Sequence, residues 1–384
     1  MSGKEKTGLY IHVPFCSKRC SYCDFYSSTD VHVERIRAYV ESVKQSLRAW
    51  APQLKEGEIS TIYFGGGTPA MLGRYIIEVL EEIHSCFVVD SDAEITVEAN
   101  PGSLSGDIVE EWIGAGVGRI SIGVQSFDKD ALKVLGRFHT VEDTMKALAL
   151  LDECEVTVSL DLMCGIPYQN SDSWKAQLEM AIACDPDHIS IYPLTLEEGT
   201  VLAQKVEERA VPEPSEDEVA RQMQLAHYML SEAGYEHYEI ANYAKPSKES
   251  RHNLGYWSGV PYLGIGPSAA SMFREEDGTR IRGIVHSSLD CFLESAQQID
   301  RAQWDEFEAL NAEKAVREGI MLGMRLMRGV EESCVDQAGL SDVFEELVTK
   351  GLVEHGGNPN RFRPTSEGWL LGNEIYGAIW NQSR

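Results

Sequence analysis

The amino-acid sequence predicts an α/β fold built around a partial (β/α)6 barrel of the TIM-like kind. From residue 9 to about residue 195, short β-branched runs alternate with longer amphipathic stretches, a pattern typical of a parallel sheet covered by helices. Glycine and polar residues recur where each expected strand ends, and a barrel gathers such positions around one mouth. A doubly wound sheet would fit the alternation alone, whereas the strand ends favour the barrel.

Six strands are expected in this part of the chain, and each is rich in β-branched residues. They are the runs LYIHVPF, STIYFGG, EITVEANP, RISIGVQS, VTVSLDLMCG and HISIYPL, which begin at Leu9, Ser60, Glu94, Arg119, Val156 and His188. Amphipathic spacing predicts helices between them over residues 34–49, 73–84, 105–115, 141–154 and 171–183.

The remainder of the chain predicts two further units. We expect the barrel domain to span residues 1–210, because Pro212 and Pro214 punctuate an acidic linker directly after it. A mixed extension is expected over residues 211–300. Residues 301–384 predict a small, mostly helical C-terminal domain that resembles a winged helix: a long helix, two shorter ones, two short strands and a terminal helix.

Charge and hydropathy limit the classes of function. The chain carries 61 acidic and 34 basic residues, a formal net charge of −27, and such a surface repels phosphate backbones. We therefore expect no nucleic-acid partner. Apolar runs stay shorter than the roughly 20 residues that cross a bilayer, and the polar start lacks the pattern of a signal peptide. The sequence predicts a cytoplasmic protein without a membrane anchor of its own.

Three of the nine cysteines fall close together in YIHVPFCSKRCSYCDF, residues 10–25. An odd number of cysteines in a large chain indicates reduced thiols rather than disulfides. Cys16, Cys20 and Cys23, spaced C-x3-C-x2-C, can hold three corners of an iron–sulfur cube and leave one iron open. A zinc site would need a fourth protein ligand, for which His12 is conceivable but lies within a strand. We predict a [4Fe–4S] cluster on the three cysteines.

This spacing after a first barrel strand resembles the signature of the radical S-adenosylmethionine superfamily. The wider wording, Y-x-H-x-P-F-C-x3-C-x2-C, is similar to the branch that includes oxygen-independent coproporphyrinogen III dehydrogenase (HemN) and the heme chaperone HemW. The resemblance extends from Tyr10 to at least Pro267. It implies that the open iron holds S-adenosylmethionine.

The resemblance also implies which residues surround this cofactor. Tyr22 is similar to the residue whose backbone contacts the adenine, and Tyr10 to a tyrosine near the sulfonium. The glycine run FGGGTP implies contacts with the amino group and carboxylate from Gly66, Gly67 and Thr68, where glycine lets backbone N–H groups approach a ligand. The remaining residues implied at the cofactor, from later strand ends and loops, are Glu98, Gln125, Arg137 and Asp161. Carboxylates suit hydroxyls and cations, and arginine suits a carboxylate.

The branch implies two alternative functions. One is a chaperone that binds heme and transfers it to client heme proteins. The other is an enzyme that generates a 5′-deoxyadenosyl radical and oxidatively decarboxylates coproporphyrinogen III. Phe25 replaces the extra cysteine of the dehydrogenase, only nine residues precede Tyr10, and H-N-x-x-Y-W from His252 to Trp257 resembles the heme-associated motif of HemW.

We therefore favour a heme chaperone with three cofactors: the cluster, S-adenosylmethionine and heme. His252 is the expected ligand of the heme iron, since imidazole is a common axial ligand, although a buried structural role would fit a lone histidine equally well. The expected partners are client heme proteins, respiratory and in some cases membrane-associated. We expect a monomer or a homodimer. Whether the cofactor is cleaved in any enzymatic reaction stays open at this point.

Overall fold

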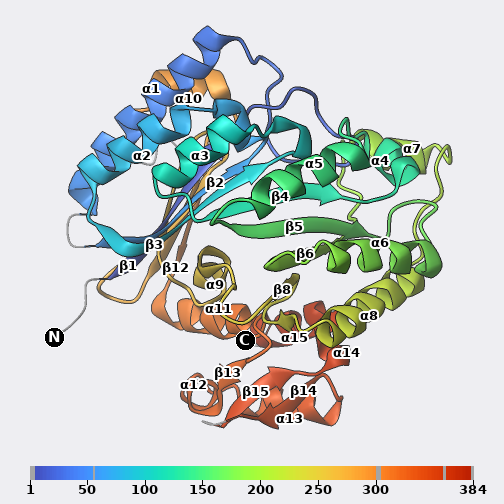
Figure 1. Ribbon diagram of the computed structural model, residues 1–384. Helices are drawn as coiled ribbons and strands as arrows, with labels where there is room; N and C mark the ends of the chain where they lie inside the picture. The colour runs from blue at the N-terminus through green and yellow to red at the C-terminus, as the bar shows by residue number, and fades with distance from the viewer. Residues whose placement is uncertain (1–4, 55–56, 300–303, 358–359, 382–384) are drawn as a thin grey trace.

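The computed structural model describes residues 5–54, 57–299, 304–357 and 360–381. A curved sheet runs through the molecule, with helices of the first half of the chain over its outer face and the C-terminal unit below it in the view of Figure 1. Within the described residues, no helix is long and apolar enough to cross a membrane.

Six parallel strands form the centre of the sheet and confirm the predicted fold class. Their interiors are rich in valine, isoleucine and leucine because helices and barrel interior cover both faces. Leu9, Ile11 and Val13 of the first strand, for example, are fully buried. In spatial and chain order they are β1 (Lys6–Val13), β2 (Glu58–Gly66), β3 (Val89–Ala99), β4 (Arg119–Gln125), β5 (Thr157–Cys164) and β6 (His188–Pro193).

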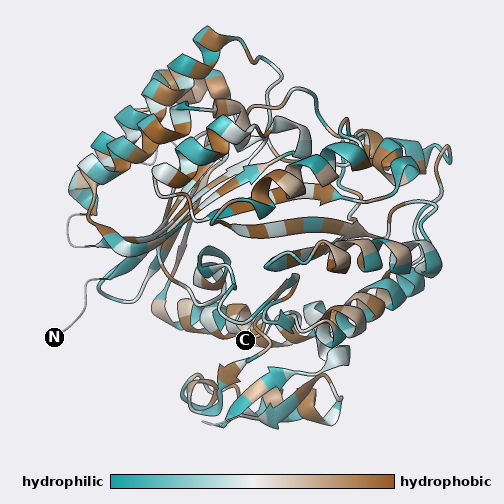
Figure 2. Ribbon diagram, in the orientation of Figure 1, coloured by the Kyte–Doolittle hydropathy of each residue, from teal (hydrophilic) through white to brown (hydrophobic). Residues whose placement is uncertain are grey.

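The expected helices lie on the outside of these strands. They are α1 (Val33–Trp50), α2 (Tyr75–Cys86), α3 (Gly106–Gly114), α5 (Val141–Asp152) and α6 (Ser171–Ala183), joined by the short 3-10 turns η1 (Ala51–Gln53), η2 (Pro69–Leu72) and η3 (Pro101–Ser103). Figure 2 shows hydrophobic and hydrophilic residues alternating along α1 and α2, as expected for helices with one face on a core. The side chains of Tyr39, Trp112 and Trp174 are among the largest in that core.

Two further helices follow strand ends and were missing from the sequence prediction: α4 (Lys129–Leu135) and α7 (Val201–Glu207). The side chain of Asp128 caps α4 by accepting from the N–H groups of Asp130 (2.7 Å) and Ala131 (3.0 Å), and Gly136 ends it in the left-handed region. Each helix spans seven residues, which is too short for a helical period to stand out in the sequence.

The extension, together with residues 304–310 from the start of the expected C-terminal domain, continues the sheet at both edges. Beyond β6 lie β8 (Asn242–Ala244) and β7 (Glu236–His237), and beyond β1 lie the parallel strand β9 (Tyr262–Ile265) and the antiparallel strands β10 (Ala270–Arg274), β11 (Arg280–Val285) and β12 (Trp304–Leu310). Its helices are α8 (Glu216–Glu232), α9 (Arg251–Trp257) and α10 (Leu289–Ser295). The sheet is thus open from β12 to β7, and the partial barrel is its six-stranded centre.

The last part of the chain has its own small hydrophobic core and three-stranded sheet, in the order β13-β15-β14. The succession of helix, strand, two helices and two strands is that of a winged helix. Trp369 ties this unit to the extension, because its indole N–H donates to the carbonyl of Ile240 (2.8 Å). The elements are α11 (Ala312–Gly323), β13 (Val330–Glu331), α12 (Glu332–Gln337), α13 (Ser341–Thr349), β14 (Val353–Gly356), β15 (Arg361–Pro364), α14 (Ser366–Leu370) and α15 (Gly372–Trp380).

Candidate functional site

A cavity of about 380 Å³ opens at the carboxyl ends of the parallel strands. We call it the cysteine pocket. Its lining includes every residue predicted for the cluster and for S-adenosylmethionine except Tyr10, and it does not include His252, the predicted heme ligand. Those present are Cys16, Cys20, Tyr22, Cys23, Gly66, Gly67, Thr68, Glu98, Gln125, Arg137 and Asp161. Carboxyl ends of parallel strands meet at one edge, which is why positions so far apart in sequence converge.

The cysteine loop follows β1 and is fastened by the two helices that the sequence did not indicate. The N–H of Ser21 donates to the carbonyl of Leu135 (2.9 Å), and its hydroxyl donates to the carbonyl of Val134 (2.8 Å), both at the end of α4. The N–H of Leu202, in α7, donates to the carbonyl of Ser21 (2.7 Å). Ser21 lies between Cys20 and Cys23, so these bonds hold the centre of the loop in place.

Gly67 allows β2 to approach the cysteine loop closely. A Cβ atom at this position would lie 2.7 Å from the carbonyl oxygen of Phe15, 2.9 Å from that of Val13 and 3.0 Å from the Sγ of Cys16. The N–H of Gly67 donates to the carbonyl of Val13 (2.8 Å). The position therefore requires glycine, and its backbone lies against the first cysteine.

Arg137 and Asn100 form a hydrogen-bonded group beside the thiols. The guanidinium of Arg137 donates to the carbonyl of Gly123 (2.6 Å) and to the side-chain oxygen of Asn100, and lies 3.6 Å from the Sγ of Cys20. The amide of Asn100 donates to the hydroxyl of Thr68 (2.9 Å), which is 3.7 Å from the Sγ of Cys16. Asn100 was missed in the sequence, where an Asn-Pro pair predicts only a turn.

The thiols are reduced, and burial disfavours their thiolate forms. Burial raises the pKa of Cys16, and raises that of Cys23 to about 11. Each of these thiols needs positive charge nearby to ionise, and Arg137 supplies part of it for Cys16. Iron bound to the sulfur atoms would supply the rest.

The three cysteines that line one pocket are the thiol donors that an iron–sulfur cluster with one open iron requires. Among the described residues, no group of three His, Cys, Asp or Glu side chains is placed to hold one metal ion together. A cubane takes one thiolate per iron, so its ligands stand around the cube instead of meeting at a point. Three cysteines, with no fourth among the described residues that line the pocket, fit a cluster that offers one open iron to a chelating ligand when bound.

Two carboxylates line the inner wall of the cysteine pocket. Burial, followed by the charge of Asp161, raises the pKa of Glu98 to about 7, although Glu98 accepts hydrogen bonds from the hydroxyl of Tyr63 (2.8 Å) and the N–H of Gly66 (3.2 Å). Burial likewise raises the pKa of Asp161, which accepts from the hydroxyl of Ser121 (3.1 Å). The wall therefore gains negative charge most easily when a cationic ligand lies against it.

The other predicted cofactor residues lie on different sides of the pocket. Gln125, at the end of β4, has a φ of 63°, an unusual conformation for a residue other than glycine and one often found at functional sites. Tyr22 lines the pocket within the cysteine loop. Tyr10 lies deeper in the barrel, where its hydroxyl is 3.1 Å from the Nδ1 of His12. The structure therefore places Tyr10 behind the pocket wall.

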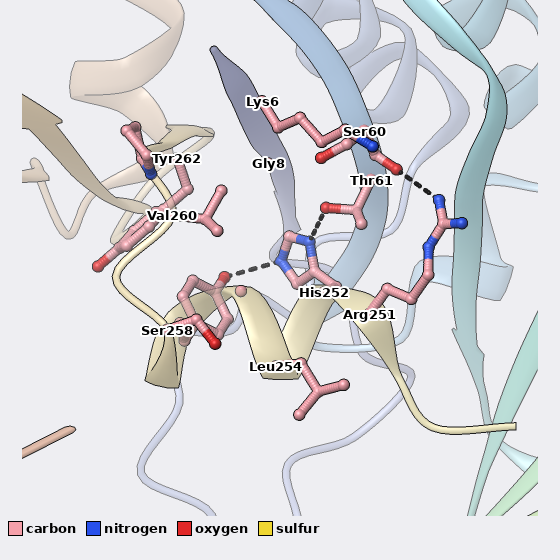
Figure 3. Close-up of a pocket in the computed structure, with 13 residues that line it drawn as sticks. Lys6, Gly8, Ser60, Thr61, Arg251, His252, Leu254, Ser258, Val260 and Tyr262 are labelled. Atoms are coloured by element: carbon pink, nitrogen blue, oxygen red, sulfur yellow. Dashed lines mark hydrogen bonds between the residues drawn. The ribbon is translucent and has the colours of Figure 1, made fainter. Parts of the chain in front are cut away.

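His252 lies in a separate cavity of about 280 Å³, near the amino ends of β1 and β2, which we call the His252 pocket. Figure 3 shows its imidazole reaching from α9 toward Thr61 of β2. Lining residues come from the two strands and from the chain around α9: Lys6, Gly8, Ser60, Thr61, Arg251, His252, Leu254, Gly255, Tyr256, Ser258, Val260, Pro261 and Tyr262.

Both ring nitrogens of His252 are hydrogen bonded. Its Nδ1 is 2.8 Å from the hydroxyl of Thr61, and its Nε2 is 2.9 Å from the hydroxyl of Tyr256. The carboxylate of Glu94 accepts from the N–H groups of His252 (3.0 Å) and Arg251 (3.1 Å) and so fixes the start of α9. Burial lowers the pKa of His252 to about 3, which keeps the ring neutral. An iron atom would have to displace one of these two hydroxyls.

Asn253 and Trp257, unlike His252 and Tyr256 of the same H-N-x-x-Y-W motif, do not line this cavity. Trp257 donates its indole N–H to the carboxylate of Glu239 (2.7 Å), and the guanidinium of Arg325 lies 4.9 Å from the centre of its ring. Arg325 also lies 4.7 Å from the ring of Tyr376 in α15. The N–H of Asn253 donates to the Ser250 hydroxyl that caps α9. Trp257 thus connects α9 to the C-terminal unit, a contact that sequence could not indicate.

Known proteins resemble this chain along nearly its whole length. A model of the Radical SAM superfamily matches residues 10–181. Radical S-adenosyl methionine domain-containing protein 1, mitochondrial, of Mus musculus is 38% identical over 373 residues, covering 92% of this chain and 83% of that protein. Heme chaperone HemW of Mycobacterium tuberculosis (strain ATCC 25618 / H37Rv) is 32% identical over 372 residues, covering 96% of this chain and 93% of the relative.

Among solved structures, coproporphyrinogen III oxidase (HemN) from Escherichia coli matches with a TM-score of 0.83. The match covers 98% of this chain and 91% of that chain at 22% sequence identity, and it shows a common fold. The chain belongs to the radical SAM superfamily, in the branch that contains HemW and HemN.

Proposed function

We propose that this protein is a heme chaperone: it binds heme and hands it to client heme proteins, with a [4Fe–4S] cluster and S-adenosylmethionine in the cysteine pocket. Membership of the superfamily implies the cluster and S-adenosylmethionine. The observation that carries the heme proposal is the similarity to HemW over 96% of this chain. It is supported by Phe25, which stands where the dehydrogenase carries a further cysteine.

The residues of the cysteine pocket divide into two groups in this proposal. Cys16, Cys20 and Cys23 hold the cluster. The cofactor is then bound by the strand ends around it, with backbone groups of Gly66 and Gly67 for its amino acid part and carboxylates for its hydroxyls and positive charge. The residues proposed to touch or orient S-adenosylmethionine are Tyr10, Tyr22, Gly66, Gly67, Thr68, Glu98, Gln125, Arg137 and Asp161.

His252 is the proposed ligand of the heme iron. In the described structure its Nε2 is bonded to Tyr256, so we propose that heme binding replaces that hydroxyl with iron. The exchange is feasible because the ring is neutral and already carries a lone pair on one nitrogen. Arg251 and Lys6 line the same cavity and are paired with Asp92 (2.9 Å) and Asp90 (3.4 Å), so heme propionates would have to exchange with these carboxylates.

A heme titration of the reconstituted protein tests this proposal. We expect wild type to develop a protein-bound Soret band, and His252→Ala to lose it or shift it, because the axial imidazole is gone. His84→Ala is the matched control, since His84 is exposed in α2. Heme-loaded wild type should then pass heme to a heme-free cytochrome b. No binding by wild type, or binding without transfer, would contradict a chaperone.

An anaerobic assay separates the chaperone from the related enzyme. The reconstituted protein is incubated with coproporphyrinogen III, a reductant and S-adenosylmethionine, and the porphyrinogens are oxidised and separated by chromatography. We expect coproporphyrinogen III to be recovered unchanged. Formation of protoporphyrinogen IX would identify the chain as a dehydrogenase instead.

A further inference from the structure

Tyr63 contacts both His252 and Glu98, a residue that lines the cysteine pocket. The hydroxyl of Tyr63 donates to Glu98 Oε1 (2.8 Å), and Glu98 lines the cysteine pocket. The ring of the same tyrosine stacks on the imidazole of His252, with 4.9 Å between ring centres and 24° between planes. A carboxylate at one end of the barrel and an imidazole toward the other are thus joined through a single side chain.

Strand β2 explains how Tyr63 reaches both. Side chains two residues apart share one face of a strand, so Thr61, Tyr63 and Gly65 all face the same side. Thr61 bonds the Nδ1 of His252 (2.8 Å), and Tyr63 stacks on the same ring. At Gly65, a Cβ atom would lie 2.9 Å from the rings of both Tyr10 and Tyr63 and 3.2 Å from Glu98 Oε1. The packing leaves Tyr63 little freedom to move independently of Glu98.

We propose that Tyr63 couples the two sites, so that S-adenosylmethionine at Glu98 weakens the binding of heme at His252. This inference rests on the function proposed above. A cationic ligand against Glu98 favours its ionised form, and an ionised carboxylate accepts the Tyr63 hydroxyl more strongly than a neutral carboxyl does. The stronger bond holds Tyr63 against His252 in the arrangement where Thr61 and Tyr256 occupy both nitrogens. A ligand that stabilises this closed arrangement disfavours the open one that iron requires.

The coupling has a measurable size and direction. Strengthening one hydrogen bond from neutral to charge-assisted corresponds to an effect on heme affinity of about 5-fold. Coupling between two binding sites is reciprocal, so heme must weaken the binding of S-adenosylmethionine by the same factor. Occupancy of the cysteine pocket therefore lowers the affinity for heme, which is the direction expected of a signal that releases heme.

The test measures heme dissociation constants by Soret titration of the cluster-reconstituted chain, with and without saturating S-adenosylmethionine. With S-adenosylmethionine, we expect the heme dissociation constant to rise about 5-fold in wild type and by less than about 2-fold in Tyr63→Phe. Tyr228→Phe is the control, because the ring of Tyr228 is exposed on α8, and it should behave like wild type. Tyr63→Phe keeps the stacked ring and removes only the bond to Glu98. Equilibrium dialysis of S-adenosylmethionine, with and without heme, checks reciprocity in wild type without relying on any variant.

The outcomes separate this inference from the proposed function. Heme binding by wild type that S-adenosylmethionine leaves unchanged, or a wild-type-sized effect retained in Tyr63→Phe, overturns the coupling and leaves the chaperone standing. Failure of wild type to bind heme at all overturns the proposed function and the coupling with it. Loss of the effect in Tyr63→Phe alone, with both ligands still bound, supports the coupling.

Discussion

The cysteine pocket and the His252 pocket share one barrel but differ in construction. The first is lined by strand ends and loops, and all of its lining residues lie before residue 198; it contains Arg137, Glu98 and Asp161 around three reduced thiols. The second is formed by the starts of two strands and a helix, and at its centre both nitrogens of His252 are already bonded. The cysteine pocket keeps hydrogen-bonding groups available for a ligand, whereas both ring nitrogens of His252 already have hydrogen-bond partners.

The difference shows that one barrel can hold polar side chains in two ways, around an open pocket or in a closed set of hydrogen bonds. Side chains of the cysteine pocket are positioned by hydrogen bonds to one another, so the site is preorganised before a ligand binds. Both ring nitrogens of His252 are held by hydrogen bonds, which the proposed heme ligand would have to displace. Ligand affinity at the first site therefore depends on the bonds that the ligand adds. At the second site it depends on the balance between the bonds that the ligand makes and the hydrogen bonds that it breaks.

Loss of the cysteines should have the largest effect and is the strongest test of the first site. In the triple variant Cys16→Ser, Cys20→Ser, Cys23→Ser, we expect iron content and cluster absorbance after anaerobic reconstitution to fall to background, because no thiolates remain to hold iron. Cys334→Ser, an exposed cysteine far along the chain, is the control and should reconstitute like wild type. A triple variant that retains its iron would show that the cluster lies elsewhere.

Gly67→Ala should break the fit between β2 and the cysteine loop. The added methyl group would meet two backbone oxygens at 2.7 and 2.9 Å, and backbone gives way less easily than a side chain. We expect a loss of about 1–3 kcal/mol in the free energy of unfolding, measured by urea denaturation, together with weaker binding of S-adenosylmethionine. Gly102→Ala is the control, since no described atom lies within 4 Å of the methyl group there. Equal effects of the two changes would argue against a specific close approach.

Opposite pH dependences should distinguish the two sites. The pKa of Glu98 is raised to about 7, so the folded chain keeps this proton longer than the unfolded chain does, and stability falls as pH rises from about 4.5 to 7. The pKa of His252 is lowered to about 3, so the unfolded chain takes up the proton first, and stability is lost as pH falls below about 6.5. Between about pH 5 and pH 7 each effect amounts to at most about 2 kcal/mol.

Urea titrations of Glu98→Gln and His252→Gln at pH 5, 6 and 7 measure these slopes against wild type. Relative to wild type, Glu98→Gln should become more stable as pH rises, because a penalty that grows with pH is gone. His252→Gln should become relatively less stable over the same range. Differences that run in the same direction for both variants would contradict the contrast between the pockets.

The smallest expected effect concerns the link between the His252 side of the barrel and the C-terminal unit. Arg325 lies between the rings of Trp257 and Tyr376, and Arg325→Met removes both cation–π contacts while keeping much of the side-chain volume. We expect a loss of about 0.5–2 kcal/mol in the free energy of unfolding, with iron content unchanged. Arg209→Met, at an exposed site, should change neither quantity. A fall in iron content would show that the C-terminal unit also supports the cysteine pocket.

Sequence predicted the barrel and most of the cysteine pocket because both depend on local patterns. β-branched runs identified β1 to β6, and strand ends converge in any parallel barrel, so Glu98 and Asp161 could be placed near Cys16 without coordinates. The short helices α4 and α7 could not be predicted, because seven residues give fewer than two full turns of helical periodicity. The role of Ser21 in holding the cysteine loop depends on these helices, so it could not be predicted either.

The surroundings of His252 could not be predicted, because they are built from distant segments. Its partners come from β2, from β3 through Glu94 and from its own helix, and no local pattern links them. The same holds for Trp257, whose indole N–H donates to Glu239 and whose ring face lies against Arg325. A motif indicates which residues matter, while long-range packing decides what each one touches.

Because Ser21 is bonded to Val134, Leu135 and Leu202, the cysteine loop cannot make these native contacts until α4 and α7 have been translated. The three cysteines are synthesised well before the segments that hold their loop in place. The proposed cluster can therefore be assembled only after synthesis of the barrel, and the nascent thiols have to stay reduced during that interval.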